Sequence, residues 1–239
     1  MAIRPFYKVV DSDISIIEQK DIEFEWIKGM AISQKQKCID SFHKSIKDYY
    51  PDSKILEIST KSRNDLGVKL SAFNLTKYSI KKNKEYSVEC LFQGSKVFEK
   101  GGPFVEIYNM TSREAKKYFQ DKELGNLLYF QFGKEKWELV PTTMFYDWLY
   151  LTTLHEKKDL VSELIKYDIF TDIEFNPKKS YNNQAKSVAL YVALYKKNML
   201  KILESIEEYK KNLDLLYGKE KNIVKKQVGQ LSILKVQER

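Results

Sequence analysis

Residues 88–98, VECLFQGSKVF, combine a strongly apolar segment with three polar side chains. On a helix, which turns about 100° per residue, Glu89, Gln93 and Lys96 fall within about 60° of one another, and apolar residues fill the rest of the circumference. A helix that is apolar almost all round belongs in a core. We therefore expect a core helix here that carries one polar stripe and ends at the Gly-Gly-Pro sequence at 101–103.

The polar stripe has two interpretations. Buried charges need partners or a wet cavity, because desolvating a lone ion costs several kcal/mol. Glu89 and Lys96 can form an internal ion pair, with Gln93 as a structural hydrogen-bonding group. Alternatively, the stripe is the floor of a pocket, since perturbed acids and amines cluster at functional sites, although structural networks perturb them too. The residues alone leave both interpretations open.

The chain has 239 residues, 43% of them hydrophobic, which suits one domain or one domain with an appendage. Periodicity predicts strands at 6–10, 22–27 and 54–59, and a hairpin formed by 126–132 and 136–140. It predicts helices at 33–50, 112–123, 142–154, 159–167 and 185–198. The fold class is α+β and predominantly helical, with helices packed around a small antiparallel sheet. Residues 1–198 are expected to form the main domain, and 199–239 a C-terminal helical appendage of two helices separated by Gly218.

The net charge of +8 favours polyanionic partners, nucleic acid above all and nucleotide phosphates next, although a merely lysine-rich protein has the same charge. Cys38 and Cys90 lie among apolar residues and are expected to be free thiols. The two cysteines and two histidines lack zinc-ligand spacing. No run reaches the roughly 18 apolar residues of a membrane span, and the N-terminus has no apolar signal region. We therefore expect a cytoplasmic protein.

Several blocks, in order along the chain, resemble the NADAR family of small enzymes related to the YbiA type of N-glycosidase. They include LSAFN at 70–74 and SVECLFQGSK at 87–96, where the family element V-E-x-x-x-Q-x-x-K matches Val88, Glu89, Gln93 and Lys96. The blocks QKQKCIDSFH, EISTKS, FYDWLY and TDIEFNPKKS are most similar to the branch found beside DarT-type toxins. The resemblance runs from about residue 29 to 195. In place of the family's later acidic, Trp-Gly-containing segment stands TDIEFNPKKSYNNQA at 171–185.

The resemblance implies a metal-free and cofactor-free enzyme that removes ADP-ribose from guanine bases in DNA or RNA and reverses the action of a cognate DarT-type toxin. It implies that Lys96 attacks the anomeric carbon and forms a Schiff base, and that Glu89 is the acid–base carboxylate. Apolar surroundings favour the neutral, nucleophilic amine. A module that binds ADP-ribosylated nucleic acid without turnover and a small-molecule N-glycosidase remain the alternatives. The choice between DNA and RNA, the oligomeric state and the role of the tail stay open.

Each of the other candidates for substrate binding also has an ordinary structural explanation. The candidates are Gln93, Ser71, Asn74, Asp147, Trp148, Asn182, Ser59, Lys61 and Ser62. Ser71 and Asn74 can hold ribose or phosphates, or they can be turn residues. Trp148 can stack on a base or fill the core, and Asp147 can accept from ribose hydroxyls or lie on a helix surface. Residues 59–62 follow a strand end, where ligand sites often lie, and the loop 176–184 can form the far wall or be solvated.

Overall fold

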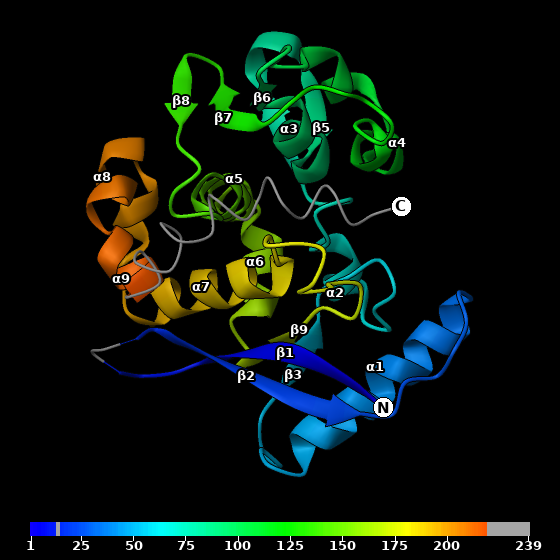
Figure 1. Cartoon of the computed structure of the whole chain (residues 1–239). Helices are drawn as coiled ribbons and strands as arrows, with labels where there is room; N and C mark the ends of the chain where they lie inside the picture. The colour runs from blue at the N-terminus through cyan, green and yellow to red at the C-terminus, as the bar shows by residue number, and fades with distance from the viewer. Residues whose placement is uncertain (13–14, 219–239) are drawn as a thin grey trace.

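The main sheet lies at the bottom of the molecule in Figure 1 and has the strand order β2-β1-β9-β3. The computed structural model describes residues 1–12 and 15–218. The four strands are β1 (Ala2–Val9), β2 (Ile17–Phe24), β3 (Ile55–Glu57) and β9 (Ile169–Thr171). Strand β1 pairs antiparallel with β2 and β9, whereas β3 pairs parallel with β9. The expectation of an antiparallel sheet is therefore wrong for this pair, because the long connection between β3 and β9 lets the two strands run in the same direction.

Two smaller sheets lie in the upper part of Figure 1, together with short helices. One is the hairpin of β4 (Thr76–Ser79) and β5 (Lys84–Ser87), and the other has the order β6-β7-β8. The expected hairpin around Gly133, whose φ is 61°, is confirmed as β7 and β8. The remaining elements of this part are β6 (Lys96–Phe98), β7 (Leu127–Phe132), β8 (Glu135–Trp137), α3 (Val88–Gly94), η2 (Val105–Asn109) and α4 (Ser112–Lys117).

The expected long helices are confirmed as α1 (Ile32–Lys47), α5 (Met144–His155) and α7 (Gln184–Lys196). Helix α1 packs on the main sheet through its buried stripe, and α5 and α7 contact each other in the main core. Of the described residues, about 42% are in helices and about 20% in strands, so the fold is α+β. The expected predominance of helix is not confirmed. The shorter elements are α2 (Asp65–Lys69), η1 (Ile80–Lys82), α6 (Lys158–Leu164), η3 (Leu200–Leu203), α8 (Ile206–Lys211) and α9 (Leu213–Tyr217).

The single helix expected for residues 88–98 is wrong beyond its second turn. Helix α3 ends at Gly94, and Lys96 begins β6, where it pairs with Phe130. A Cβ at Gly94 would lie 2.4 Å from the ring of Tyr108, so the chain needs glycine at this close contact. The β-branched and aromatic residues that follow favour a strand. Glu89 and Gln93 therefore share a helix face, and Lys96 approaches from a different element.

The C-terminal residues that the structure describes pack against the main core. Tyr209 and Tyr217 are buried there. The second helix expected after Gly218 lies outside the described residues. The boundary expected after residue 198, between the main domain and the C-terminal appendage, stays a prediction.

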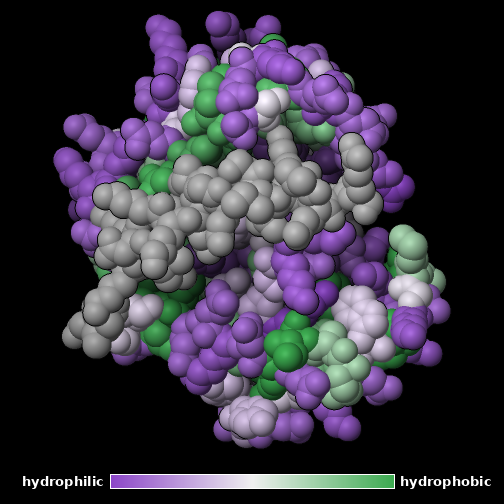
Figure 2. Space-filling view, in the orientation of Figure 1, coloured by the Kyte–Doolittle hydropathy of each residue, from purple (hydrophilic) through white to green (hydrophobic). Residues whose placement is uncertain are grey.

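Cys38 and Cys90 are free, buried thiols, as expected. Within residues 1–12 and 15–218, no helix is long and apolar enough to cross a membrane. On the face shown in Figure 2, hydrophilic side chains cover much of the described surface, with smaller apolar areas between them.

Candidate active site

Three segments that are distant in sequence meet at the backbone of Ala72. The Ala72 N–H donates to Oε1 of Gln184 at 2.8 Å, and its carbonyl accepts from the N–H of Glu89 at 2.9 Å. Gln184 is the first residue of α7, and Glu89 lies in the first turn of α3, which is capped by Ser87. The loop around Ala72 thus holds the N-terminal ends of both helices in one place. We call this region the Ala72 junction.

Glu89 and Gln93 form the acidic side of the junction. Glu89 is only 7% exposed, and its Oε1 accepts from Nε2 of Gln93 at 2.9 Å. Among the described residues, Oε1 of Gln93 and Oγ of Ser71 are buried and have no hydrogen-bond partner. An unsatisfied buried polar atom costs about 1–3 kcal/mol. Both atoms are therefore candidates for hydrogen bonds with a bound substrate.

Lys96 reaches the same helix from its strand. Its Nζ lies 5.3 Å from the ring centroid of Phe92 and 5.1 Å from that of Phe119, and the side chain is partly exposed. The faces of aromatic rings attract an ammonium group. Phe92 follows Glu89 by three residues on α3, so the two are neighbours on the helix surface. The amine and the carboxylate thus lie along one helix, although Lys96 is not part of it.

Tyr146 and Asp172 join this site, and the sequence analysis missed both. Burial raises the pKa of Tyr146 well above its ordinary value, and the charges of Glu89 and Asp172 raise it further. The Tyr146 ring packs edge-on against Phe92, with ring centroids 5.2 Å apart, so Tyr146 lies against the helix that carries Glu89. Asp172 directly follows β9. An acid that directly follows a short apolar run, as in IFTD, is the sequence signal that could have identified it.

Asp172 forms a buried pair of acids with Glu57. Burial raises the pKa of each, and for Asp172 the charge of Glu57 adds to the effect. Glu57 accepts from Oγ1 of Thr171 at 2.6 Å and from the N–H of Ile173 at 2.8 Å. Two neighbouring buried carboxyls resist losing both protons. The pair therefore keeps a proton at a higher pH than free carboxyls do.

Asp147 and Trp148 make structural contacts on other faces of α5. The buried Asp147 carboxylate accepts from the hydroxyls of Thr143, Ser187 and Tyr217 at 2.6, 2.6 and 3.0 Å. Burial raises its pKa. Trp148 packs against Trp137 with ring centroids 4.7 Å apart. These contacts do not bring either residue to Glu89, and their roles in substrate binding stay predictions.

The expected residues 59–62 form turns after β3. Oγ of Ser59 accepts from the N–H of Lys61, and Oγ of Ser62 from the N–H of Asn64, both at 3.2 Å. The preceding carbonyl, that of Ile58, accepts from Nε2 of Gln184 at 2.6 Å. The segment is therefore tied to the Ala72 junction, and the oxygens of Ser59 and Ser62 accept hydrogen bonds within the turns.

Asn74 and Asn182 differ in their surroundings. Asn74 is exposed, and its Nδ2 donates to the carbonyl of Val68 at 2.9 Å. Oδ1 of Asn182 is buried and has no hydrogen-bond partner among the described residues. The next residue, Asn183, caps α7 by accepting from the N–H of Ala185. Asn182 is thus a further candidate for a substrate contact, two residues before Gln184.

The fold and the junction define an α+β protein with an acid-lined candidate site between a core helix, a loop and the start of a second helix. The family described as the DarT1-associated NADAR antitoxin matches residues 2–223, and the chain belongs to this family. No curated protein matches the sequence. The family match confirms the resemblance found in the sequence and extends it at both ends.

Proposed function

We propose that this protein is an ADP-ribosylguanine glycohydrolase. It removes ADP-ribose from guanine bases in nucleic acid and thereby acts as the antitoxin to a cognate, guanine-specific DarT-type toxin. Its family supports the antitoxin role. The observation that carries the proposal is the buried Glu89 carboxylate, which is held by Gln93 beside the unpartnered atoms Ser71 Oγ and Gln93 Oε1.

In the proposed reaction, the neutral amine of Lys96 attacks the anomeric carbon of ADP-ribose. A C–N bond to lysine forms as the bond to guanine breaks, and the electron pair of the broken bond goes to the guanine nitrogen. The Glu89 carboxylate takes the proton that the attacking amine loses and passes it to that nitrogen. The sugar ring then opens to a Schiff base, which water hydrolyses to release ADP-ribose and restore the amine.

The strand position of Lys96 changes the support for this mechanism. The helical spacing between Glu89 and Lys96 no longer supports it, because Lys96 begins β6. The support is now the match to the family's lysine and the placement of Nζ beside Phe92, on the helix that carries Glu89. Asp172 of the buried acid pair is hydrogen-bonded to Gln184 at the Ala72 junction, which supports a role of the pair in binding ribose hydroxyls.

The decisive experiment incubates the protein with an oligonucleotide that is ADP-ribosylated on guanine and measures free ADP-ribose by chromatography. Release of ADP-ribose together with unmodified oligonucleotide is the expected result. Tight binding without release would instead support the non-catalytic module. Release only from small-molecule N-glycosides would support the third alternative.

A further inference from the structure

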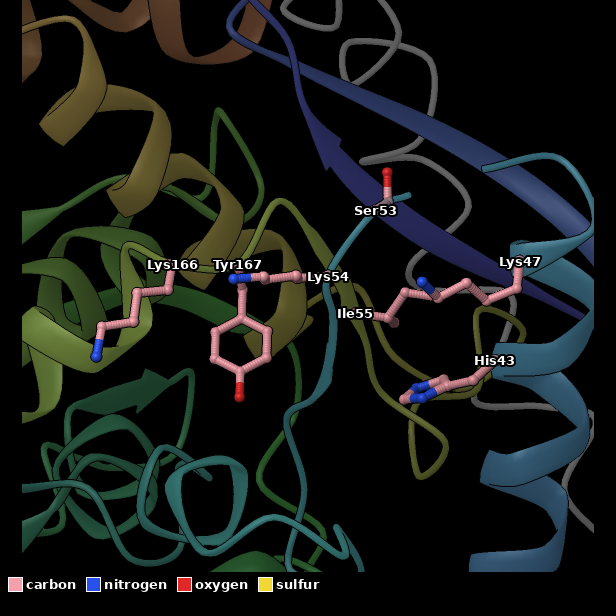
Figure 3. A pocket seen from close by; sticks show the side chains of 7 residues that line it. All are labelled: His43, Lys47, Ser53, Lys54, Ile55, Lys166 and Tyr167. Atoms are coloured by element: carbon pink, nitrogen blue, oxygen red, sulfur yellow. The ribbon is translucent and has the colours of Figure 1, made fainter. Parts of the chain in front are cut away.

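A second concave region lies outside the Ala72 junction, between α1, β3 and the connection from α6 to β9 (Figure 3). Its volume is about 440 Å³. It is lined by His43, Lys47, Ser53, Lys54, Ile55, Lys166 and Tyr167. We call it the lysine pocket.

Three lysines from separate parts of the chain line this pocket, and no carboxylate does. Lys47 points from α1 into the gap in Figure 3 and donates to the carbonyl of Pro51 at 2.7 Å. Within the described part of the chain, none of the three pairs with a carboxylate, and the side chains of Lys54 and Lys166 make no hydrogen bond. The positive charges of the three lysines in this pocket repel one another. A bound anion would offset this repulsion by attracting all three.

The neutral lining groups suit an anion with several oxygens. The hydroxyl of Tyr167 accepts from Nδ2 of Asn64 at 2.9 Å, so its own hydrogen can be donated to a ligand. Ser53 adds a second hydroxyl. Burial lowers the pKa of His43 to about 4, so its ring adds no charge at neutral pH. Phosphate oxygens accept hydrogen bonds from lysines and from hydroxyls of this kind.

The pocket is connected to the candidate site through the segment that follows β3. Asn64, which bonds Tyr167 at the pocket, caps α2 by accepting from Leu66 at 2.9 Å, and the loop after α2 leads directly to Ser71 and Ala72. At the other end of the segment, Ile58 bonds Gln184 at the Ala72 junction. The chain segment 58–64 therefore contacts both places, with Ile58 buried at the Ala72 junction and Asn64 exposed at the lysine pocket.

We propose that the lysine pocket binds a phosphodiester of the nucleic-acid backbone next to the modified guanine. The inference rests on the proposed function for the identity of the molecule that carries the phosphate. The pocket lies in the size range of small-ligand sites, so it can hold a phosphate with part of its nucleotide. It contributes affinity without reading the base sequence.

The test compares two double variants of equal charge. Lys54→Gln with Lys166→Gln removes two pocket lysines, and Lys28→Gln with Lys134→Gln removes two exposed lysines elsewhere. Binding of a fluorescein-labelled, unmodified DNA oligonucleotide is measured by anisotropy across a salt series, and thermal unfolding verifies that each variant is folded. A parallel arm measures whether inorganic phosphate competes.

The pocket variant is expected to weaken DNA binding and to reduce the slope of log K against log [salt] by about 0.7–0.9 per lysine, with a smaller effect in the control variant. Equal losses in both variants, no loss in either, or a wild type that binds no DNA would overturn the inference. So would a pocket that binds inorganic phosphate but contributes nothing to DNA binding. Because unmodified DNA is used, failure of the glycohydrolase proposal is seen separately, as absent ADP-ribose release from modified DNA.

Discussion

The side-chain amide of Gln93 donates to the Glu89 carboxylate at 2.9 Å across one turn of α3. This bond fixes the orientation of the amide, because Nε2 must face Glu89 and Oε1 must face away from it. Oε1 is buried and has no partner among the described residues. Gln93 therefore both holds the carboxylate and presents an acceptor for a hydroxyl or N–H group of the substrate.

Replacing Glu89 by Gln should keep the fold and remove most of the activity. The change is nearly isosteric and removes the charge and the ability to transfer a proton, which is worth about 10²–10⁴ in rate. The measurement is the rate of ADP-ribose release, with thermal unfolding as the check on the fold. The matched control is Glu138→Gln, the same change at an exposed residue, which should leave the rate unchanged. A Glu89→Gln protein that unfolds yet keeps its rate per folded molecule would make Glu89 a structural group.

Replacing Lys96 by Arg should abolish turnover but preserve substrate binding. Arginine keeps a positive charge beside Phe92 and Phe119 but stays protonated, so it cannot attack as an amine. Borohydride added during turnover should trap ADP-ribose on Lys96 in the wild type and give no adduct in the variant, as read by mass spectrometry. Lys100→Arg, at an exposed lysine nearby, is the control. An active Lys96→Arg enzyme without a trappable adduct would refute the covalent mechanism and leave Glu89 catalysis standing.

The sequence predicted those elements whose pattern is set locally. Helix α1 has a one-sided apolar stripe, and the β7–β8 hairpin is marked by its glycine at positive φ. The end of α3 could not be predicted in this way, because a buried helix and a buried strand are both apolar on all sides and the switch depends on pairing with β7. Strand β9 is three residues long and is defined by its distant partners.

The residues of the candidate site could also be predicted only in part from the sequence. Glu89 and Gln93 were predicted because they form a polar stripe at helical spacing, and the family element then matched the same positions. On α5, the sequence analysis selected Asp147 and Trp148, yet it is their neighbour Tyr146 that packs against Phe92 on α3, the helix that carries Glu89. Successive helical residues point about 100° apart, and a helix that is apolar on most faces gives no signal of its rotation. Which of three adjacent residues enters the site was therefore settled by packing.

Replacing Tyr217 by Phe should destabilise the protein without changing the rate of the folded fraction. The Tyr217 hydroxyl donates to Asp147 at 3.0 Å and lies 2.7 Å from the hydroxyl of Tyr209. Losing a hydrogen bond to a buried carboxylate costs about 1.5–3 kcal/mol. Urea unfolding measures the loss, and an assay under native conditions measures the rate. Unchanged stability would show that the C-terminal segment contributes little to the core through this bond.

The last prediction concerns His43 and the dependence of stability on pH. Nε2 of His43 lies 2.8 Å from Oγ1 of Thr171, whose hydroxyl donates to Glu57, so a neutral His43 with its hydrogen on Nε2 can donate to Thr171. Burial lowers the pKa of His43 from 6.5 to about 4, and nearby Asp40 opposes this only partly. Between these pH values the unfolded chain binds a proton that the folded protein does not, so the free energy of unfolding falls as pH falls from about 6.5 to 4.

His43→Gln should remove this component, because an amide can still donate to Thr171 but does not titrate. The two pKa values set its size at no more than about 3 kcal/mol. The free energy of unfolding is measured with urea at several pH values between 7 and 4. As pH falls, the wild type should lose more of this free energy than the variant does. The carboxyl groups titrate in both proteins, so their contribution largely cancels in that difference. Parallel curves for the two proteins over this range would show that His43 takes up its proton equally well in the folded state, and the neutral His43–Thr171–Glu57 chain would have to be abandoned.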